Sequence, residues 1–358
     1  AQATPERLVA DVPSPLAESG FEFFDGTDGV LVAKTLSELR SEVADNDDPA
    51  AFTLAGPRQE LAFRPARLGA GIVTCGGLCP GLNDVIRSIV LTMHHHYRVP
   101  EILGFRYGYA GVAGEGPPPL RLTADAVDSA HRQGGTMLGT SRGPQPIDVM
   151  LDHLARVGVR VLFCIGGDGT LRGASALAQA AKERGQPLGV IGIPKTIDND
   201  LEWVDQSFGF STAVDEATRA IQAAHNEARG AVNGIGLVKL MGRHSGFIAA
   251  HASLSNPDVN LCLVPEVPFA LEGAGGLLDV LGRRLAARGH AVIVAAEGAG
   301  QDLVGPSGLT DKSGNQRLVD IGIFLRDRIR EHFAAEQRNV TVKYIDPSYT
   351  IRSLPASA

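Results

Sequence analysis

A strand-like apolar run that ends on glycines and one carboxylate is the first segment of this sequence that suits phosphate chemistry. Residues 161–170 read VLFCIGGDGT and place Asp168 between Gly167 and Gly169, with Thr170 next. Glycines let phosphate oxygens approach the backbone, and because Asp168 would repel those oxygens, we expect a bridging Mg²⁺. A tight strand-to-helix turn is the alternative interpretation. The chain contains no G-x-x-x-x-G-K-[ST] segment, so this is not a Walker A loop.

Two aspartates form the second candidate group. Asp198 and Asp200 lie two residues apart in IGIPKTIDNDLEW, residues 191–203. In an extended loop this spacing points both side chains to one side, which suits a general base next to a second carboxylate that orients it. An Asx-rich turn is the simpler alternative. Lys195, just before them, can pair with a carboxylate or a phosphate.

Two arginines and an earlier glycine pair complete the pattern. Arg142 follows a glycine-rich turn in GGTMLGTSRG and Arg243 follows another in KLMGRHSG, while Gly76 and Gly77 interrupt VTCGGLCPGLN before a predicted helix. Backbone N–H groups at a helix start attract phosphate, and arginine can fork onto phosphoryl oxygens. Each arginine taken singly is also consistent with a surface ion pair. Together with the aspartates they predict phosphoryl transfer.

An alternation of apolar runs and amphipathic segments must position these residues. Continuous apolar runs separated by amphipathic helices are typical of parallel sheets covered on both faces. We therefore predict an α/β fold with doubly wound parallel sheets, in which ligands collect beyond the carboxyl ends of the strands. Strands are expected within 68–75, 101–108, 159–167, 187–194, 234–242 and 290–298, and helices within 82–97, 148–158, 171–185 and 213–230.

Composition limits the class of protein. The 358 residues are 44% hydrophobic and carry a formal charge of −7, so the overall charge gives no attraction to nucleic acid or an acidic membrane. No apolar run approaches the length of a membrane span, and the N-terminus has no signal core. The four cysteines do not have the spacing of a metal site, and we expect them to be reduced thiols in the core. We expect His94 to His96 to form a solvated helix end rather than a metal site. Residues 1–65 are expected to form an irregular extension.

Eight motifs together carry a resemblance to a known family. The sequence resembles the 6-phosphofructokinases, most closely the branch of plants and trypanosomatids, over residues 70–352. The motifs occur in the family's order: TCGGLCPGLN, GGTMLGTSRG, IGGDGT, PKTIDND, LMGRHSGFIA, LVPEVPF, AAEGAGQ and VKYIDPSYTIR. The resemblance implies two Rossmann-like domains with the active site in the cleft between them, a nucleotide domain over 66–205 and a sugar-phosphate domain over 206–358 that is incomplete at its end.

The resemblance also implies a role for each site residue. Asp168 would bind Mg²⁺, and Asp198 would take the proton from the 1-hydroxyl of fructose 6-phosphate. The implied ATP-binding residues are Gly76, Gly77, Arg142, Gly143, Gly167, Asp168, Gly169 and Thr170. The implied sugar-phosphate residues are Thr196, Asp198, Asp200, Met241, Gly242, Arg243, Glu297, Lys343, Tyr349 and Arg352, of which Thr196, Asp198 and Arg243, together with Arg142, would serve catalysis. Lys343 takes the place of an arginine that bacterial relatives bring from a neighbouring subunit.

The phosphoryl donor follows from one position in the resemblance. In the family, an aspartate at position 169 goes with pyrophosphate, whereas the glycine found here leaves room for ATP. Lys195 before T-I-D is usual in pyrophosphate enzymes. The same lysine also occurs, together with this glycine, in the ATP-using branch resembled here. ATP is therefore the expected donor. A pyrophosphate-dependent enzyme and a catalytically silent regulatory subunit are the alternatives. NAD kinases and diacylglycerol kinases share the G-G-D-G-T loop but not the later motifs.

Assembly and setting are expectations from the resemblance alone. It implies a homotetramer, a dimer of dimers, in the cytoplasm, with a plastid or glycosome left open. The resemblance does not identify the allosteric effectors of this chain, since Leu91 occupies a position where bacterial relatives have an arginine. Relatives continue well past Arg352, so the sequence is expected to be a fragment, and whether it is active alone is left open.

Overall fold

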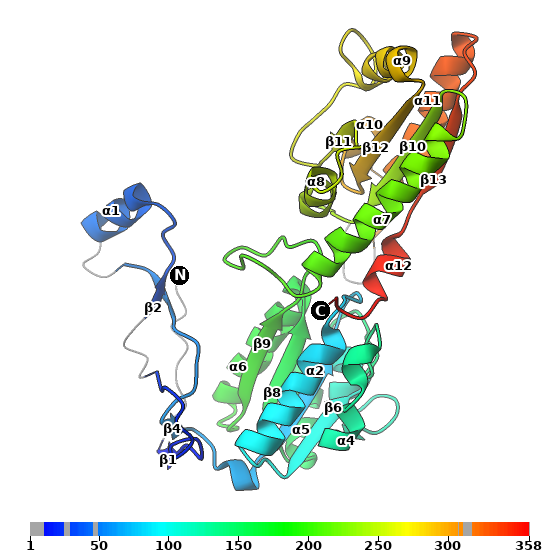
Figure 1. The fold of residues 1–358 in the computed structure, drawn as a ribbon. Helices are drawn as coiled ribbons and strands as arrows, with labels where there is room; N and C mark the ends of the chain where they lie inside the picture. The colour runs from blue at the N-terminus through cyan, green and yellow to red at the C-terminus, as the bar shows by residue number, and fades with distance from the viewer. Residues whose placement is uncertain (1–10, 25–28, 46–48, 307, 311–316, 358) are drawn as a thin grey trace.

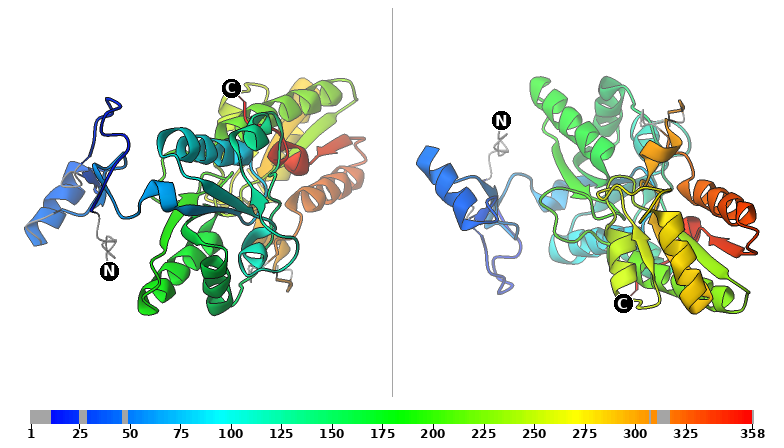
Figure 2. Two further views of the ribbon diagram at one scale, coloured as in Figure 1. Left: turned by 90° about the horizontal axis from the view of Figure 1, so that it is seen from below. Right: turned by 90° about the horizontal axis from the view of Figure 1, so that it is seen from above.

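The structure, a computed structural model, describes residues 11–24, 29–45, 49–306, 308–310 and 317–357. Two separate sheets with their helices form the body, and an N-terminal segment stands to one side of it (Figures 1 and 2). That segment contains two short antiparallel strand pairs, one helix and a 3-10 turn. Its elements are β1 (Val12–Pro13), β2 (Gly29–Leu31), α1 (Leu36–Asp45), β3 (Ala51–Thr53), β4 (Glu60–Leu61) and the turn Pro65–Arg67.

The helix α1 corrects the prediction that residues 1–65 are irregular, as far as the described residues reach. It begins with a capping box, in which Glu38 Oε2 accepts from the amide of Thr35 at 3.0 Å and Thr35 Oγ1 accepts from the amide of Glu38 at 3.2 Å. This reciprocal pair satisfies amides that a helix start leaves without partners. The T-x-x-E signal of this capping box is present in the sequence at residues 35–38. Residues 1–10 of the predicted extension lie outside the described residues.

The first sheet forms from the first five strands of the body. Their order is β7-β6-β5-β8-β9, parallel except for the antiparallel edge strand β7. The apolar side chains of α2 pack on one face and those of α3, α5 and α6 on the other, so the sheet is doubly wound as predicted. The strands are β5 (Gly69–Thr74), β6 (Glu101–Phe105), β7 (Leu120–Arg121), β8 (Val159–Gly166) and β9 (Gly189–Pro194). The helices are α2 (Leu82–Leu91), a π-helical turn (Thr92–His96), α3 (Gly108–Val112), α4 (Ala124–Val127), a 3-10 turn (Ala130–Arg132), α5 (Ile147–Arg156) and α6 (Asp168–Glu183).

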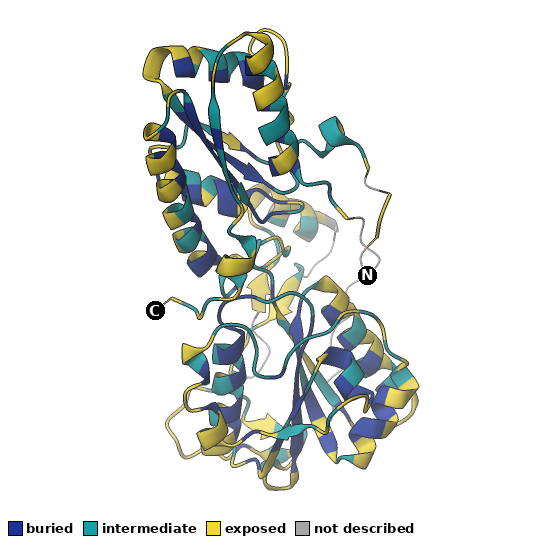
Figure 3. Ribbon diagram, turned by 90° about the vertical axis from the view of Figure 1, so that its right-hand side faces the viewer, coloured by how far each residue is buried: buried dark blue, intermediate teal, exposed yellow. Residues whose placement is uncertain are grey.

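The second sheet is fully parallel, in the order β11-β12-β10-β13. Helices α9 and α11 cover one face, and α7 and α8 cover the other. Buried residues therefore gather in two groups, one around each sheet (Figure 3). The strands are β10 (Gly234–Leu240), β11 (Leu261–Leu263), β12 (His290–Ala296) and β13 (Thr341–Ile345). The helices are α7 (Phe210–Arg229), α8 (Phe247–Leu254), α9 (Leu277–Arg288), α10 (Gln301–Val304), α11 (Ile321–Ala335) and α12 (Ser348–Arg352).

Three smaller predictions can be compared with the structure. Cys75, Cys79 and Cys164 are buried free thiols as expected, but Cys262 is exposed, because β11 is the edge strand of its sheet. His94 to His96 are exposed at the end of the π-helical turn, and the described residues contain no group of three or more potential metal ligands. Among the described helices, none has the length and apolar character needed to cross a bilayer.

Candidate active site

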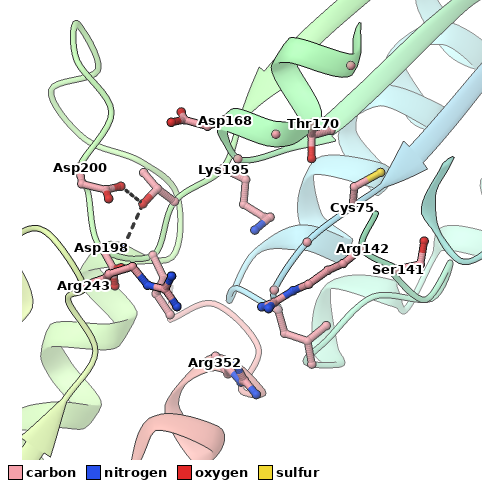
Figure 4. A pocket seen from close by; sticks show the side chains of 18 of the residues that line it. Cys75, Ser141, Arg142, Asp168, Thr170, Lys195, Asp198, Asp200, Arg243 and Arg352 are labelled. Carbon is pink, nitrogen blue, oxygen red and sulfur yellow. Dashed lines mark hydrogen bonds between the residues drawn. The ribbon is translucent and has the colours of Figure 1, made fainter. Parts of the chain in front are cut away.

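A cavity of about 1020 Å³ lies where the two sheets meet. Its walls come mainly from segments that follow six parallel strands, namely β5, β8 and β9 of the first sheet and β10, β12 and β13 of the second. The loop before α5, with Arg142, and α3 also contribute. The carboxyl ends of the strands in both sheets therefore face one space, which is where open α/β sheets bind ligands. Asp168 and Asp198 both line it, as Figure 4 shows.

Glycine-rich turns of the first sheet form one wall. Gly76 has φ +84°, a conformation that favours glycine, and its carbonyl accepts from Thr140 Oγ1 at 2.7 Å. A Cβ on Gly77 would lie 3.7 Å from the Arg142 guanidinium, so that arginine rests along the turn. Gly167 precedes α6, and the residues of the first turn of that helix, Asp168, Gly169 and Thr170, line the cavity. Such a wall suits the phosphates of a nucleotide.

Asp168 is the first residue of α6 and the candidate magnesium ligand. Its side chain is 68% exposed, and Arg172 lies 3.9 Å away on the next turn of the helix. Mg²⁺ in nucleotide sites takes one or two carboxylates and fills its other positions with phosphate oxygens and water. A single accessible carboxylate beside a phosphate-binding helix end fits that requirement.

The loop after β9 holds Asp198 by contacts with both sheets. Thr196 Oγ1 donates to Asp200 and accepts from the Asp198 amide at 3.2 Å, as the dashed lines in Figure 4 show. Ser245, in the loop after β10, donates through its hydroxyl to the carbonyl of Asp198 at 3.0 Å. Asn199 has φ +56° and accepts from the Ser207 amide at 2.7 Å, which turns the chain after Asp198.

Asp198 has the properties expected of a general base. Burial and the negative charges of Asp200 and Glu297 raise its pKa to about 7, although the amide and charge of Arg243 act in the opposite direction. Its Oδ1 is buried with no hydrogen-bond partner among the described residues. A buried acceptor without a partner is costly, so the cavity presents an oxygen that a ligand hydroxyl would satisfy.

The second sheet contributes the opposite wall. Arg243 and Glu297 follow β10 and β12, while Tyr349 and Arg352 lie on α12 after β13. The Arg352 guanidinium stacks 4.2 Å from the Tyr349 ring centre, and its Nε is buried with no hydrogen-bond partner in the described chain. Burial raises the pKa of Glu297, against the lowering effect of Arg243. This wall combines two arginines with one buried donor that lacks a partner, Arg352 Nε, which suits an anionic ligand.

Sixteen of the eighteen predicted site residues line the cavity. Gly242 does not; it has φ +126° and forms the turn between Met241 and Arg243, where a Cβ would collide with the Ser245 carbonyl. Lys343 also lies outside and forms a 3.1 Å ion pair with Glu227 on α7. The structure therefore does not bring Lys343 to the pocket of its own chain.

Four charged residues of the cavity were absent from the predicted set, namely Arg172, Lys195, Lys239 and Asp346. Lys195 is buried, and a Cβ on Gly76 would lie 3.8 Å from its ammonium, which places it between the glycine turn and the aspartate loop (Figure 4). Burial lowers the pKa of Lys195. Lys239 and Asp346 also line the cavity. A charged residue inside the apolar strand GIGLVKL was the sequence signal for Lys239.

The fold and the cavity define the class of this molecule, a two-sheet α/β protein with one large cavity at the carboxyl ends of the strands of both sheets. The sequence profile described as Phosphofructokinase matches residues 69–358. The chain belongs to the phosphofructokinase family.

Relatives at about half identity have the same enzyme name. The chain is 50% identical to "ATP-dependent 6-phosphofructokinase" of Amycolatopsis methanolica over 92% of its length and 74% of the relative's. It is 51% identical to "ATP-dependent 6-phosphofructokinase 1" of Arabidopsis thaliana, over 86% of this chain and 65% of the relative. It is 50% identical to "ATP-dependent 6-phosphofructokinase" of Trypanosoma cruzi, over 89% of this chain and 66% of the relative. The chain thus spans about two thirds to three quarters of the length of these relatives.

Solved structures support the fold. A structure titled as pyrophosphate-dependent phosphofructokinase from Marinobacter aquaeolei superposes with a TM-score of 0.65 at 23% identity, over 80% of this chain and 69% of that one. The structure of phosphofructokinase from Saccharomyces cerevisiae superposes with a TM-score of 0.63 at 22% identity, over 81% of this chain and 39% of that one. At this identity the likeness concerns architecture alone.

Proposed function

We propose that this chain transfers the terminal phosphoryl group of ATP to the 1-hydroxyl of fructose 6-phosphate, giving fructose 1,6-bisphosphate in glycolysis. The observation that carries the proposal is the state of Asp198. Its pKa is raised to about 7 and its Oδ1 lacks a partner, in a cavity that also holds cationic side chains from both sheets. A base poised near neutral pH, facing a phosphate site, suits transfer to a hydroxyl.

The chemical step needs one proton acceptor and several positive charges. Asp198 accepts the proton of the 1-hydroxyl as the sugar oxygen forms its bond to the terminal phosphorus, and the bond from that phosphorus to the bridging oxygen of ATP breaks. Arg142 and Arg243 point into the same space in Figure 4, where they stabilise the charge on the transferring group. Tyr349 and Arg352 hold the distal phosphate of the sugar, and Met241, Arg243 and Glu297 hold its body.

The donor occupies the first-sheet wall. Gly76, Gly77, Gly143 and residues 167–170 provide room and N–H groups for its phosphates, and Lys195 adds a buried cation next to them. Asp168 would hold Mg²⁺, which when bound neutralises part of the donor's negative charge.

ATP is favoured over pyrophosphate by the space around position 169. A Cβ built on Gly169 meets no atom within 4 Å, so the cavity extends past the position where a carboxylate would exclude a nucleotide's α-phosphate. The names of the relatives at about half identity give the same donor. Pyrophosphate remains the second candidate because Lys195 is present.

A steady-state assay of the chain with fructose 6-phosphate and each donor tests the proposal. We expect turnover with ATP and Mg²⁺ and little with pyrophosphate. Turnover with pyrophosphate alone would reverse the donor assignment. Absence of turnover with both donors, in this chain and in one extended to its relatives' length, would favour a silent regulatory subunit.

We propose further that the protein assembles as a homotetramer, a dimer of dimers, in which Lys343 reaches a neighbouring subunit's sugar phosphate. The position of Lys343 supports this, since it is 43% exposed and lies outside its own cavity. Light scattering after size exclusion would measure the assembly. Mixing Lys343→Ala subunits with Asp198→Asn subunits should restore part of the activity if the site is shared. Cytoplasmic localisation stays a prediction, and two plant relatives are named chloroplastic.

A further inference from the structure

Lys239 is a charged side chain near the end of a strand whose other residues are buried. Its Nζ lies 2.7 Å from Asp320 Oδ2 and 2.8 Å from Asp346 Oδ2, and only 12% of the side chain is exposed. A buried ammonium is strongly disfavoured unless carboxylates compensate it, and here two do. The three groups therefore form a compact ion cluster at the second-sheet wall of the cavity.

The cluster stays ionised near neutral pH. Burial by itself would lower the pKa of Lys239, but the hydrogen bonds to Asp320 and Asp346 outweigh it and raise that pKa. Burial would raise the pKa of both aspartates, and the Lys239 ammonium nevertheless holds both below the usual value. The cluster carries one net negative charge, which would repel a phosphate, so direct capture of the substrate's phosphate by Lys239 is not expected.

Asp346 connects the cluster to the helix that carries the phosphate-binding pair. It directly follows β13 and accepts from the amide of Ser348 at 3.1 Å and from the hydroxyl of the same residue. Ser348 begins α12, on which Tyr349 and Arg352 lie. The start of this short helix is therefore fixed by a carboxylate that Lys239 itself holds.

Asp320 provides a second anchor that does not face the cavity. It accepts from the hydroxyl of Tyr344 at 3.0 Å and from the amide of Ile323 at 3.0 Å, which caps α11. Lys239 thus ties the end of β10 to the start of α11 and to the end of β13. Asp320 and Asp346 lie 81 and 107 residues after Lys239, respectively, so no local interaction can set their relative position.

We propose that Lys239 is a positioning residue for the sugar-phosphate half of the active site, a role that rests on the proposed function. It acts through Asp346 and fixes α12 so that Tyr349 and Arg352 meet the distal phosphate of the substrate. Loss of the ammonium leaves Asp346 without its main partner and lets α12 move. Since Asp198 and the donor wall do not depend on α12, binding of the sugar phosphate is affected and binding of ATP is not.

Steady-state kinetics of Lys239→Met and Asp346→Asn test this role. We expect each variant to raise the KM for fructose 6-phosphate about 10- to 100-fold, with kcat and the KM for ATP within about threefold of the parent chain. Because both act on one contact, the double variant should resemble the single variants. Lys239→Arg, which keeps a charge, should give an intermediate KM.

Two matched variants control for a general loss of stability. Tyr344→Phe removes a contact to Asp320 but leaves the Lys239–Asp346 pair, and should have near-parental kinetics. Arg184→Met removes a cation that also pairs with two aspartates, Asp148 and Asp152, outside the cavity, and should change no kinetic constant. An unchanged KM in Lys239→Met, or effects of Lys239→Met and Asp346→Asn that multiply in the double variant, would overturn the proposal.

Hydrogen exchange separates this proposal from the proposed function. Without any substrate, the amides of residues 350–354 should exchange faster in Lys239→Met than in the parent chain, while those of α6 should not. Unchanged exchange in α12 would refute the positioning role even if the enzyme is active. If the parent chain does not phosphorylate fructose 6-phosphate, the proposed function fails and the exchange result still decides the role of Lys239. Should Lys239→Met not fold, Asp346→Asn gives the same comparison.

Discussion

Ser245 donates a 3.0 Å hydrogen bond to the backbone carbonyl of Asp198, and thereby joins the loop after β10 to the loop after β9. The contact therefore crosses from a loop of the first sheet to a loop of the second. It places Asp198 beside Arg243, whose backbone amide and charge act on the carboxylate. Asp198, the proposed general base, is therefore held by both halves of the molecule, and its raised pKa depends on charged groups from both.

Replacement of Asp198 should remove turnover and leave donor binding intact. We expect Asp198→Ser to lower kcat at least about 100-fold, because the variant has no group to accept the hydroxyl proton, while the Kd for ATP changes little. Turnover and calorimetric binding measure the two effects. Asp205→Ser, in the same loop but outside the cavity, is the matched control. A near-normal rate in Asp198→Ser would exclude this carboxylate as the base.

The pH dependence of activity should report the raised pKa of Asp198. As the deprotonated form is the base, kcat/KM should rise as pH increases toward about 7 and then level off. Asp200 is one cause of the raised pKa, so Asp200→Asn should move this acid limb to lower pH. A limb unmoved by Asp200→Asn would show that another group controls it.

The same pKa makes a prediction about stability. An acid whose folded pKa lies above its unfolded value of 3.8 binds its proton more tightly in the folded state, so its ionisation destabilises the protein as pH rises from about 4 to about 7. Asp198→Asn removes the charge and should therefore raise Tm by a few degrees at pH 8 but not at pH 4. Differential scanning calorimetry at both pH values measures this, and an equal effect at both would contradict it.

Substitution at position 169 should change donor binding without harming the fold. A carboxylate there meets open space and lies in the first turn of α6, where negative charge is favourable. Gly169→Asp should keep its Tm and raise the KM for ATP about tenfold or more through repulsion of the donor phosphates. Gly169→Ala, which adds only a methyl group, serves as control. A similar loss in both variants would point to crowding instead of charge.

Asp168→Asn should raise the Mg²⁺ concentration needed for half-maximal activity. An amide is a weaker ligand for a hard cation than a carboxylate, and Asp168 is the accessible carboxylate at the start of α6. Titration of activity with Mg²⁺ at saturating ATP measures the shift, and the Kd for fructose 6-phosphate should be unchanged. An unaltered Mg²⁺ requirement would assign the metal to another group.

Much of the fold could be predicted from the sequence because it follows local patterns. Apolar runs and amphipathic segments identified six strands and four helices of the body, and the position of Asp168 and Asp198 after strands predicted that they would share a cavity. The helices α9 and α11 and the strand β13 were not among the predicted elements. The helix α1 was missed although its capping signal is local. The edge strands β7 and β11 are two and three residues long, too short to leave a periodic pattern.

By itself, then, the sequence determined the α/β class, the main strands of both sheets and most of the residues that line their shared cavity. Only the tertiary structure decided the raised pKa of Asp198, the burial of Lys195 beside Gly76 and the tie between Lys239 and Asp346. Each of these depends on side chains from segments far apart in the chain, whose desolvation and charge interactions exist only after both sheets have packed together. Spacing along the chain specifies which groups are available, whereas their ionisation and orientation are set by the neighbours that folding brings to them.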